Sequence, residues 1–415
     1  MNENELKAMR NSFKTVYDKR KGILNDPQVK NLQEKVINIR KDSIDNNPEL
    51  IESLKKSFDR NDIDYAFASN DEEARKLIQD IIISESDEND NINFDDSNPI
   101  VVAKSKSNTL GEISASNFLK SKGMDVVETD LGDRILQLKG KDNKPAHPTG
   151  PASHLNVEAI SDIVSKGLGK DIPPNPKDIM DAVKKDILIR LSDAKIGLSG
   201  ANAVASEDGS LVFIHNEGNI SLISLMKTHI VVVGIEKIVR TIEDAISIAK
   251  LETIYATGSK VTSYINIVSG PSKTADIEKK LLKNMYGAEK VFVIILDNGR
   301  SEAIKSIGEC LYCIGCGSCI VTCPVYNAIG NDFGFNNYLG GRGVAMSKFI
   351  QNTETSVSSG LYKCTLCGLC KISCPVTIST SEIIENLRAE THKEGLYPKK
   401  HDKFKENIKN KGSPY

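Results

Sequence analysis

The chain has 415 residues, long enough for two or three domains with sizeable hydrophobic cores. Its 54 Lys and Arg residues nearly balance 56 Asp and Glu residues, so the charge gives no sign of a nucleic-acid or membrane-surface protein. The longest apolar runs, at 229–235 and 291–296, are too short to cross a bilayer, and the charged amino terminus lacks the apolar stretch of a signal peptide. We therefore expect a soluble cytoplasmic protein with no membrane span and no nucleic-acid partner.

Residues 1–58 are charged and follow a helical pattern. Leu50, Ile51, Leu54 and Phe58 recur at helical spacing. This segment is predicted to form a helical arm, which either packs against the rest of the chain or contacts another subunit.

Residues 59–300 alternate between strand and helix patterns. Strands are predicted at 63–69, 99–105, 124–130, 209–216, 229–235, 263–270 and 290–298. Helices are predicted at 70–84, 111–123 and 176–194. The last has Ile179, Val183, Ile187 and Leu191 on one face, and the acidic stretch 84–98 is expected to be a solvated loop. This alternation predicts an α/β fold with a largely parallel sheet.

No glycine-rich dinucleotide fingerprint and no P-loop follows any of these strands. A parallel sheet still tends to bind ligands where its strands end, and the segments there are 103–107, 128–133 and 215–219. Lys104, Ser105 and Lys106 could hold a carboxylate or a phosphate, although exposed charges at a strand end explain them equally well.

Glu207, Glu217 and Asn219 lie in 200–219 and could bind a ligand, unless Gly209 and Gly218 mark ordinary turns. The candidate substrate-binding residues are Lys104, His147, Glu207, Glu217 and Asn219, and no catalytic residue is assigned.

His147 and His154 lie in 145–154, and either could act as a general base on a 2-hydroxy acid. A loop histidine bonded to backbone is favoured, because no carboxylate that could orient either ring is near in sequence. His215 alternates with apolar residues on a strand and is expected to be structural. His392 and His401 belong to a basic tail that is predicted to be a docking or solvated segment.

All nine cysteines lie between Cys310 and Cys374. Two runs each read Cys-x2-Cys-x2-Cys-x3-Cys-Pro, the bacterial ferredoxin spacing for two [4Fe–4S] clusters, in which the fourth cysteine serves the other cluster. One cluster is therefore assigned to Cys313, Cys316, Cys319 and Cys374, and the other to Cys364, Cys367, Cys370 and Cys323.

Three glycines, Gly315, Gly317 and Gly368, stand between ligands, where the backbone must curl round the sulfurs and a Cβ would often clash. Structural zinc is the alternative, but a zinc site usually takes two Cys-x2-Cys pairs and requires neither a third cysteine at this spacing nor the Cys-Pro ending. Cys310 falls outside the register and is expected to be a bystander, with a spare or alternative ligand as the second possibility.

These motifs together resemble those of the LUD-domain iron–sulfur proteins of the lactate utilisation B type. The stretches that carry the resemblance run in the family's order, from about Asn61 to Arg388. They are 101–107, 126–138, 145–154, 200–219, 229–239, 295–301 and 313–326.

The resemblance implies a NagB/RpiA/CoA-transferase-like α/β domain, followed by a small α-helical two-cluster ferredoxin-type domain. The predicted boundaries are 1–58 for the helical arm, 59–300 for the LUD domain, 301–388 for the two-cluster domain and 389–415 for the basic tail. Two departures from the family are Cys310, where an apolar residue is more usual, and the segment 330–349, which replaces a Pro-Gly-rich linker.

The function that the resemblance implies is an iron–sulfur electron-transfer subunit of a cytoplasmic complex oxidising L-lactate, or another 2-hydroxy acid, to the keto acid. The expected partners are a heterodisulfide-reductase-like CCG-domain iron–sulfur protein and a second LUD protein. The chain ends soon after the second run, so the CCG domain is expected on a separate polypeptide, and the chain alone is expected to be inactive. The alternative is an electron-transfer adaptor for such a CCG partner, with a LUD domain that does not catalyse.

Overall fold

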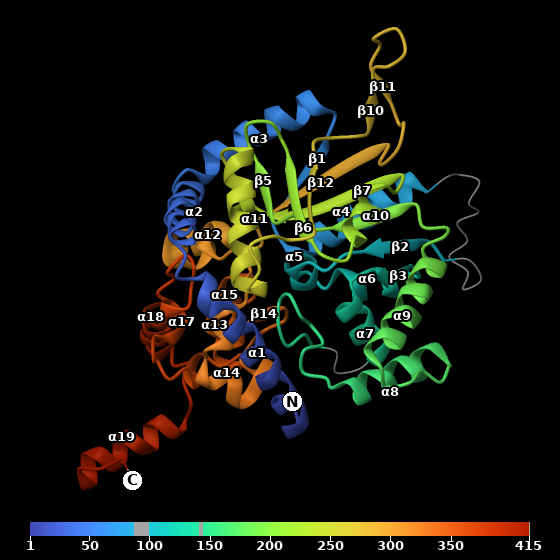
Figure 1. Ribbon diagram of the computed structural model, residues 1–415. Helices are drawn as coiled ribbons and strands as arrows, with labels where there is room; N and C mark the ends of the chain where they lie inside the picture. Colours follow the sequence, from blue (N-terminus) through green and yellow to red (C-terminus); the bar gives the residue numbers. More distant parts are fainter. Residues whose placement is uncertain (87–98, 141–143, 415) are drawn as a thin grey trace.

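The computed structural model describes residues 1–86, 99–140 and 144–414. At its centre is a six-stranded sheet in the order β1-β12-β7-β4-β2-β3, with every neighbouring pair parallel (Figure 1). Its strands are β1 Asp64–Ala68, β2 Val101–Lys104, β3 Asp125–Glu128, β4 Ile196–Ser199, β7 Thr228–Gly234 and β12 Lys290–Leu296. The predicted α/β fold with a parallel sheet is confirmed.

Both faces of this sheet are covered, which explains why its strands are almost uniformly apolar. Every residue of β7 is buried. The apolar core on one face includes residues of α4, α5 and α6, and the core on the other includes residues of α3 and a second sheet. These helices are α3 Asn47–Asn61, α4 Asp71–Glu85, α5 Asn108–Glu112 and α6 Ala115–Ser121.

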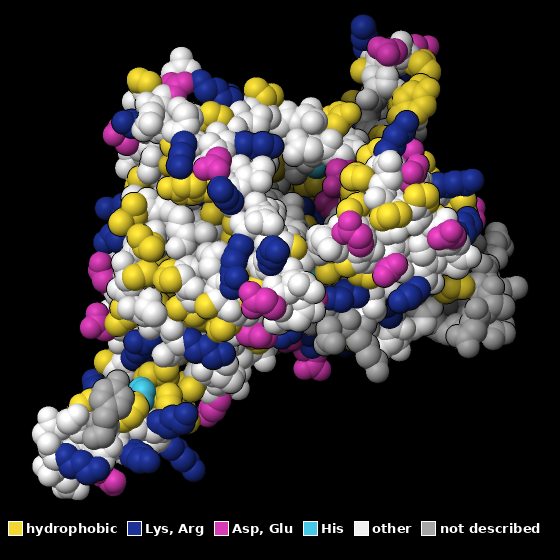
Figure 2. Space-filling view, turned by 60° about the horizontal axis from the view of Figure 1, so that its bottom comes forward, with side chains coloured by type: hydrophobic (Ala, Val, Ile, Leu, Met, Phe, Trp, Pro, Cys, Tyr) yellow, Lys and Arg dark blue, Asp and Glu magenta, His cyan; other side chains and the backbone are white. Residues whose placement is uncertain are grey.

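The second sheet has four strands in the order β8-β5-β6-β9, and it mixes parallel and antiparallel pairs. Its strands are β5 Ala203–Ala205, β6 Leu211–His215, β8 Ile238–Val239 and β9 Tyr264–Val268. The strands predicted at 209–216 and 263–270 therefore exist but pair here, outside the central sheet. A short hairpin of β10 Lys273–Thr274 and β11 Leu282–Lys283 projects from the body with apolar side chains on it (Figures 1 and 2).

The prediction of a single helix at 111–123 is wrong. The segment forms two short helices, α5 and α6, because Ser114 between them adopts a left-handed conformation with φ of 51°. A non-glycine residue in that region interrupts a helix.

A helical layer of α7 Leu131–Lys139, α8 Val157–Leu168 and α9 Pro176–Arg190 has its own small apolar core. Ile179, Val183 and Ile187 are buried there, as the predicted apolar face of 176–194 requires. The acidic stretch predicted as a loop, 84–98, lies mostly outside the described residues. Two further helices of the α/β part are α10 Asn219–Ser224 and α11 Ile242–Thr257, and the 3-10 turn η1 spans Ile235–Lys237.

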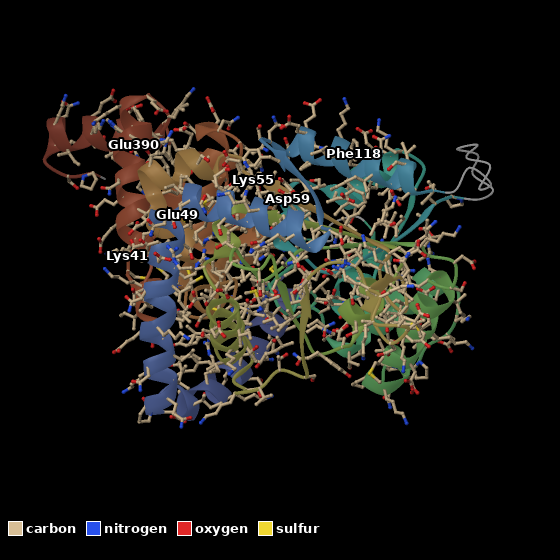
Figure 3. All side chains as sticks on the ribbon, turned by 90° about the horizontal axis from the view of Figure 1, so that it is seen from above. Lys41, Glu49, Lys55, Asp59, Phe118 and Glu390 are labelled. Atoms are coloured by element: carbon tan, nitrogen blue, oxygen red, sulfur yellow. The ribbon has the colours of Figure 1, made fainter. Side chains whose placement is uncertain are left out.

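The predicted amino-terminal arm consists of three helices, α1 Glu3–Ile23, α2 Pro27–Asp45 and α3. Residues of α1 and α2 share one continuous core with α11 and with the cysteine-rich region. Seen from above, Glu49, Lys55 and Asp59 mark the outer side of α3, between Glu390 and Phe118 (Figure 3). The arm thus packs on this chain, as one of the two predicted alternatives had it.

The cysteine-rich region is built of short helices. They are α12 Arg300–Ile307, η2 Gly308–Tyr312, α13 Ser318–Val321, α14 Pro324–Ile329, η3 Gly330–Asp332, α15 Gly340–Ile350, α16 Thr353–Ser358, η4 Leu361–Lys363, α17 Leu369–Ile372 and α18 Thr380–Lys393, with β13 Gly334–Phe335 and β14 Tyr338–Leu339. The last helix, α19 Lys400–Lys411, projects away from the body, and Lys and Arg side chains gather on it (Figures 1 and 2). None of the described helices is long and apolar enough to cross a membrane.

A buried ion network ties the central sheet to the segment between the cysteine runs. Arg300, which begins α12 after β12, donates to Glu112 at 2.7 and 2.9 Å and to Glu236 at 2.5 Å. The Tyr338 hydroxyl of β14 donates to Glu112 at 2.5 Å. All four side chains are buried, and the carboxylates hold the pKa of Arg300 well above its usual value despite its burial. Glu112 lies at the end of α5, and Glu236 and Arg300 follow β7 and β12, so the network joins these three segments.

We expect Arg300→Ala to lower the free energy of unfolding by about 3–5 kcal/mol, because it leaves two carboxylates buried without their partner. Chemical denaturation followed by circular dichroism measures this change. The control is Lys305→Ala on the same helix, whose exposed pair with Glu302 is worth less than about 0.5 kcal/mol. Equal effects of the two substitutions would contradict a structural role for the network.

Candidate iron–sulfur centres and an adjoining cavity

The fold brings the two cysteine runs together as two neighbouring sets of thiols. Cys316 and Cys319 interact electrostatically with Cys313 of their own run and with Cys374 of the second run. Cys323 of the first run interacts with two cysteines of the second, Cys364 and Cys370, and Cys370 also interacts with Cys367. Each fourth cysteine thus lies with the opposite run, which is the arrangement that the crossed assignment requires, while the ligand assignment itself stays a prediction.

Within the described residues, no three His, Cys, Asp or Glu side chains are close enough to hold a single metal ion. A [4Fe–4S] cluster has its four thiolates on separate iron atoms, so it does not need that geometry.

The backbone around the sulfurs is curled in the way the sequence predicted. Gly315, Gly317 and Gly368 all have positive φ, and Leu366 adopts φ of 55° at the place in the second run where Gly315 stands in the first. The expected clash of a Cβ occurs only at Gly317, where it would lie 2.3 Å from Nε2 of His147. At Gly368 nothing lies within 4 Å, so glycine there is explained by the backbone conformation alone.

Backbone N–H groups also approach the sulfurs. The N–H of Gly315 donates to Sγ of Cys313 at 3.4 Å, and the N–H of Tyr326 donates to Sγ of Cys323 at 3.4 Å. Hydrogen bonds of this kind stabilise thiolate charge and tune the potentials of iron–sulfur clusters.

Buried arginines near the first set of cysteines indicate whether a negatively charged cluster fits there. Arg20 is 3% exposed and bonds only to uncharged groups, the Tyr255 carbonyl and the Ser318 hydroxyl, and its Nε has no partner. Its charge interacts with Cys316 and Cys319, and burial lowers its pKa.

Two more arginines surround the same set. Arg40 donates to the carbonyls of Leu311 and Tyr312, and burial lowers its pKa to about 10. Arg342 donates to the carbonyl of Cys310, and its charge interacts with Cys313. Among the described residues none of these three arginines forms an ion pair with a carboxylate, and buried cations require a nearby anion. A cluster held by four thiolates carries negative charge, so it fits this pocket and would supply one-electron transfer there.

Cys310 is fully buried in the shared core, and burial raises the pKa of its thiol to about 12. Its Sγ lies 3.9 Å from the Arg342 carbonyl. The structure does not test its predicted role as a bystander.

The second set is the more exposed of the two, although most cysteines of both are half-buried. Cys367 is exposed, whereas Cys316 is buried. Leu369 and Ile372 on α17 are 42% and 82% exposed, although both are large apolar residues. The two sets therefore differ in burial and in the charges around them.

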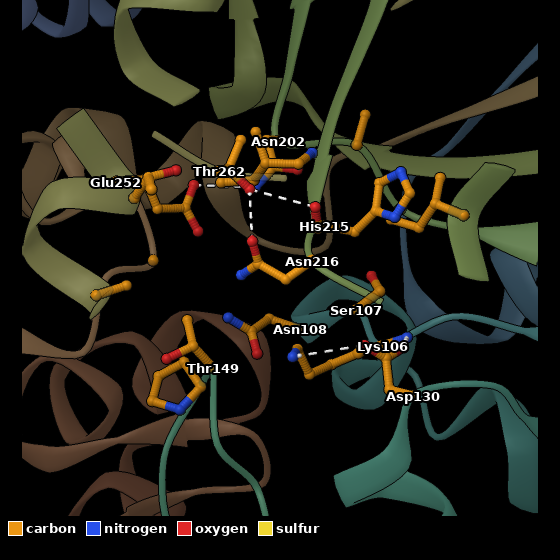
Figure 4. A pocket seen from close by; sticks show the side chains of 18 of the residues that line it. Lys106, Ser107, Asn108, Asp130, Thr149, Asn202, His215, Asn216, Glu252 and Thr262 are labelled. Atoms are coloured by element: carbon orange, nitrogen blue, oxygen red, sulfur yellow. Dashed lines mark hydrogen bonds and ion pairs between the residues drawn. The ribbon is translucent and has the colours of Figure 1, made fainter. Parts of the chain in front are cut away.

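A cavity of about 230 Å³ lies in the α/β part and reaches the first cysteine run (Figure 4). Lys106, Asp130, Glu217 and Asn219 line it from the ends of the strands, as predicted for a ligand site in a parallel sheet. Gly315 lines its far side, and a second, smaller cavity continues from there past Cys313 and Cys319.

The structure separates the predicted substrate-binding residues. Glu217 and Asn219 line the cavity, and Asn219 donates to Asp130. Lys104 is buried in an ion pair with Glu128 and lines a different cavity. It is therefore not one of the exposed charges that the strand end suggested.

Glu207 accepts a hydrogen bond from the Ile242 N–H at the start of α11, which is a helix-capping contact. His215 lines the cavity, and its ring stacks on Tyr264 at 4.9 Å. His154 is 2% exposed and lies outside the cavity.

His147 packs on the first cysteine run instead of the α/β cavity. Its Nδ1 accepts the Thr149 N–H at 3.2 Å, and Nε2 faces Gly317. Burial lowers its pKa to about 3, so the ring is neutral near pH 7. A hydrogen bond accepted at Nδ1 places the proton on Nε2, and this makes His147 a donor toward the cluster loop.

Sequence reasoning missed several residues of the site. Lys237 and Glu252 line the cavity, and Asn202 donates to Glu252 at 2.9 Å. Burial raises the pKa of Glu252, whose Oε1 lies 3.3 Å from the position of a Cβ on Gly315. Lys237 stands in the matched stretch 229–239, so that stretch was a usable signal, whereas nothing local marked Glu252 or Arg20.

The fold and the cysteine sets define an iron–sulfur protein with an α/β domain and a dicluster domain. Residues 51–296 match the model of the LUD domain family, and residues 309–378 match that of the 4Fe-4S dicluster domain. The chain belongs to the LUD domain family. The dicluster match and the grouped cysteines support [4Fe–4S] clusters as its cofactors.

The relatives extend this similarity over most of the chain. Lactate utilization protein B of Geobacillus sp. (strain WCH70) is 33% identical over 80% of this chain and 66% of its own length. Lactate utilization protein B of Bacillus cytotoxicus is 32% identical over 87% of this chain and 72% of its own. The matches thus span about two thirds of these relatives. A solved DUF162 family protein from Deinococcus radiodurans covers 60% of this chain and 98% of its own at 15% identity, with a TM-score of 0.30, which is too low to support an inference.

We expect Cys374→Ala to damage the cluster of the first run and Cys323→Ala to damage that of the second, because each fourth cysteine lies with the opposite run. Electron paramagnetic resonance of the reduced protein, with iron and sulfide analysis, separates the two. The unsubstituted protein should contain about eight iron and eight sulfide per chain. The control is Cys310→Ala, which should leave both signals intact, and stoichiometric zinc without sulfide would rule out the cluster assignment.

We expect Arg20→Gln to lower the reduction potential of the first-run cluster by on the order of 100 mV, because a nearby positive charge favours the more negative reduced state. Redox titration monitored by electron paramagnetic resonance measures the shift. Arg20→Lys should retain most of the potential, and Lys21→Gln, which removes a 63% exposed charge from the same helix, should change little. A potential unchanged in Arg20→Gln would refute this electrostatic role.

Proposed function

We propose that this protein is an iron–sulfur electron-transfer subunit in lactate utilisation, with two [4Fe–4S] clusters. The observation that carries the proposal is the position of the two cysteine sets. The first adjoins the α/β cavity through Gly315, and the second reaches the surface at Cys367. The relatives named Lactate utilization protein B supply the metabolic context.

The finer proposal is that the protein works in a cytoplasmic complex that oxidises L-lactate or another 2-hydroxy acid to the keto acid. Its partners would be a heterodisulfide-reductase-like CCG-domain protein and a second LUD protein. The exposed apolar side chains of Leu369 and Ile372, next to Cys367, support a docking partner at the second set.

Oxidation of a hydroxy acid removes two electrons, and it needs a group that accepts a hydride or an electron pair. Four-cysteine clusters carry single electrons and have no open iron for a substrate. The sequence has no dinucleotide motif that would supply another acceptor. The proposal therefore gives this chain electron transfer and assigns the completion of the reaction to its partners.

We expect the purified chain, with both clusters reconstituted, not to turn over L-lactate with an artificial electron acceptor. Turnover should appear when the CCG-type partner, with the second LUD protein where needed, is added. Anaerobic assays of pyruvate formation check this, with the Cys374→Ala variant as the control that should stay inactive in the mixture. Steady turnover by the chain alone would move the whole reaction into this protein.

A further inference from the structure

The walls of the α/β cavity offer positive charge with unused hydrogen-bonding capacity. Lys237 forms no hydrogen bond or ion pair with any described residue, and it is only partly exposed. The Lys106 ammonium forms an ion pair with Asp130 at 3.6 Å, and its charge also interacts with Glu217. Lys237 therefore keeps its donors for a ligand, and the long pair with Asp130 leaves Lys106 able to donate to a ligand as well.

The acidic groups of the same cavity are, in contrast, already satisfied. Asp130 accepts from the Lys106 N–H at 2.6 Å and from Asn219 at 3.0 Å. Glu217 accepts from the Leu131 N–H at 2.9 Å, and Glu252 accepts from Asn202. Burial raises the pKa of Glu217 and of Glu252.

We propose that this cavity binds a small organic carboxylate of the 2-hydroxy-acid class, with Lys237 and Lys106 as the residues that hold its carboxylate. The free donors of the two lysines match the acceptor oxygens of a carboxylate. The side chains of Asn108 and Asn216 approach one another across the cavity and can hydrogen-bond the remaining polar groups of the ligand (Figure 4).

The charge balance disfavours a dianion more than a monoanion. Three acidic side chains face the cavity with the two lysines, so a dianion such as a phosphate ester would meet more repulsion than a single carboxylate held by the lysines. The position next to Gly315 places the bound molecule beside the first cysteine run. The inference rests on the proposed function for its choice of acid, and it adds the site and the residues.

Equilibrium dialysis of the cluster-loaded protein with radiolabelled L-lactate tests the proposal, with inorganic phosphate as a competing probe. We expect saturable binding at one site per chain, which Lys237→Gln and Lys106→Gln each weaken about tenfold or more, because each removes a charge-assisted hydrogen bond. Lys250→Gln on exposed α11 surface changes the net charge equally and should leave the affinity within about twofold.

Lys237→Gln decides the outcome if Lys106→Gln fails to fold, because Lys237 forms no hydrogen bond or ion pair with a described residue that the substitution would break. The iron content and the circular dichroism of each variant confirm folding. Three results would overturn the proposal: no saturable lactate binding, unchanged binding in folded Lys237→Gln, or displacement of lactate by phosphate at lower concentration than unlabelled lactate. A protein with reducible clusters that binds no lactate loses this site but retains the electron-transfer role, so the two failures are distinguishable.

Discussion

The buried contact of Arg300 with Glu112 and Glu236 is the interaction on which the site depends. It joins the end of α5 to the segments that follow β7 and β12, and Tyr338 adds the segment between the cysteine runs. Lys237, which lines the α/β cavity, directly follows Glu236 in the chain. The contact between Arg300 and Glu236 therefore also positions this part of the cavity wall. A salt bridge buried this deeply adds little net stability, but losing one partner is severe, and this makes it effective at fixing the arrangement of the parts.

A second constraint comes from positive charge in the shared core. Arg20 and Arg40 come from the amino-terminal helices, whereas Arg342 comes from the segment between the runs, yet all three surround the first cysteine set. Their hydrogen bonds go to carbonyl and hydroxyl groups, and the negative charge that offsets them comes from the thiolates and, for Arg40 and Arg342, also from Glu236. The helical arm is thus part of the cofactor site, and cluster binding and folding of the arm should be coupled.

Sequence patterns predicted the parts of the structure that depend on local chemistry. The cysteine spacing indicated two crossed sets, and apolar runs such as 229–235 located the buried strands. The pairing of β6 and β9 in a second sheet was not predictable, because it depends on contacts between distant strands. Lys104 and Lys106 are two residues apart, but the strand ends at Lys104, which pairs with Glu128, whereas Lys106 pairs with Asp130 and lines the α/β cavity. No local pattern distinguishes them.

The two cysteine sets lie in different surroundings, and these affect the reduction potentials of their clusters. The first set lies among buried cations next to the cavity, and charges act more strongly in such a partly buried site than in water. The second set has an exposed cysteine and apolar neighbours, while Arg388 donates to the carbonyl of Cys364 and Arg342 lies beside both sets. Positive charge and burial act in opposite senses on the potential of a cluster, since the cations favour its reduced state and desolvation disfavours it. Arg20 lies next to Cys316 and Cys319 and pairs with no described carboxylate, so its charge opposes the effect of burial on the cavity-side cluster.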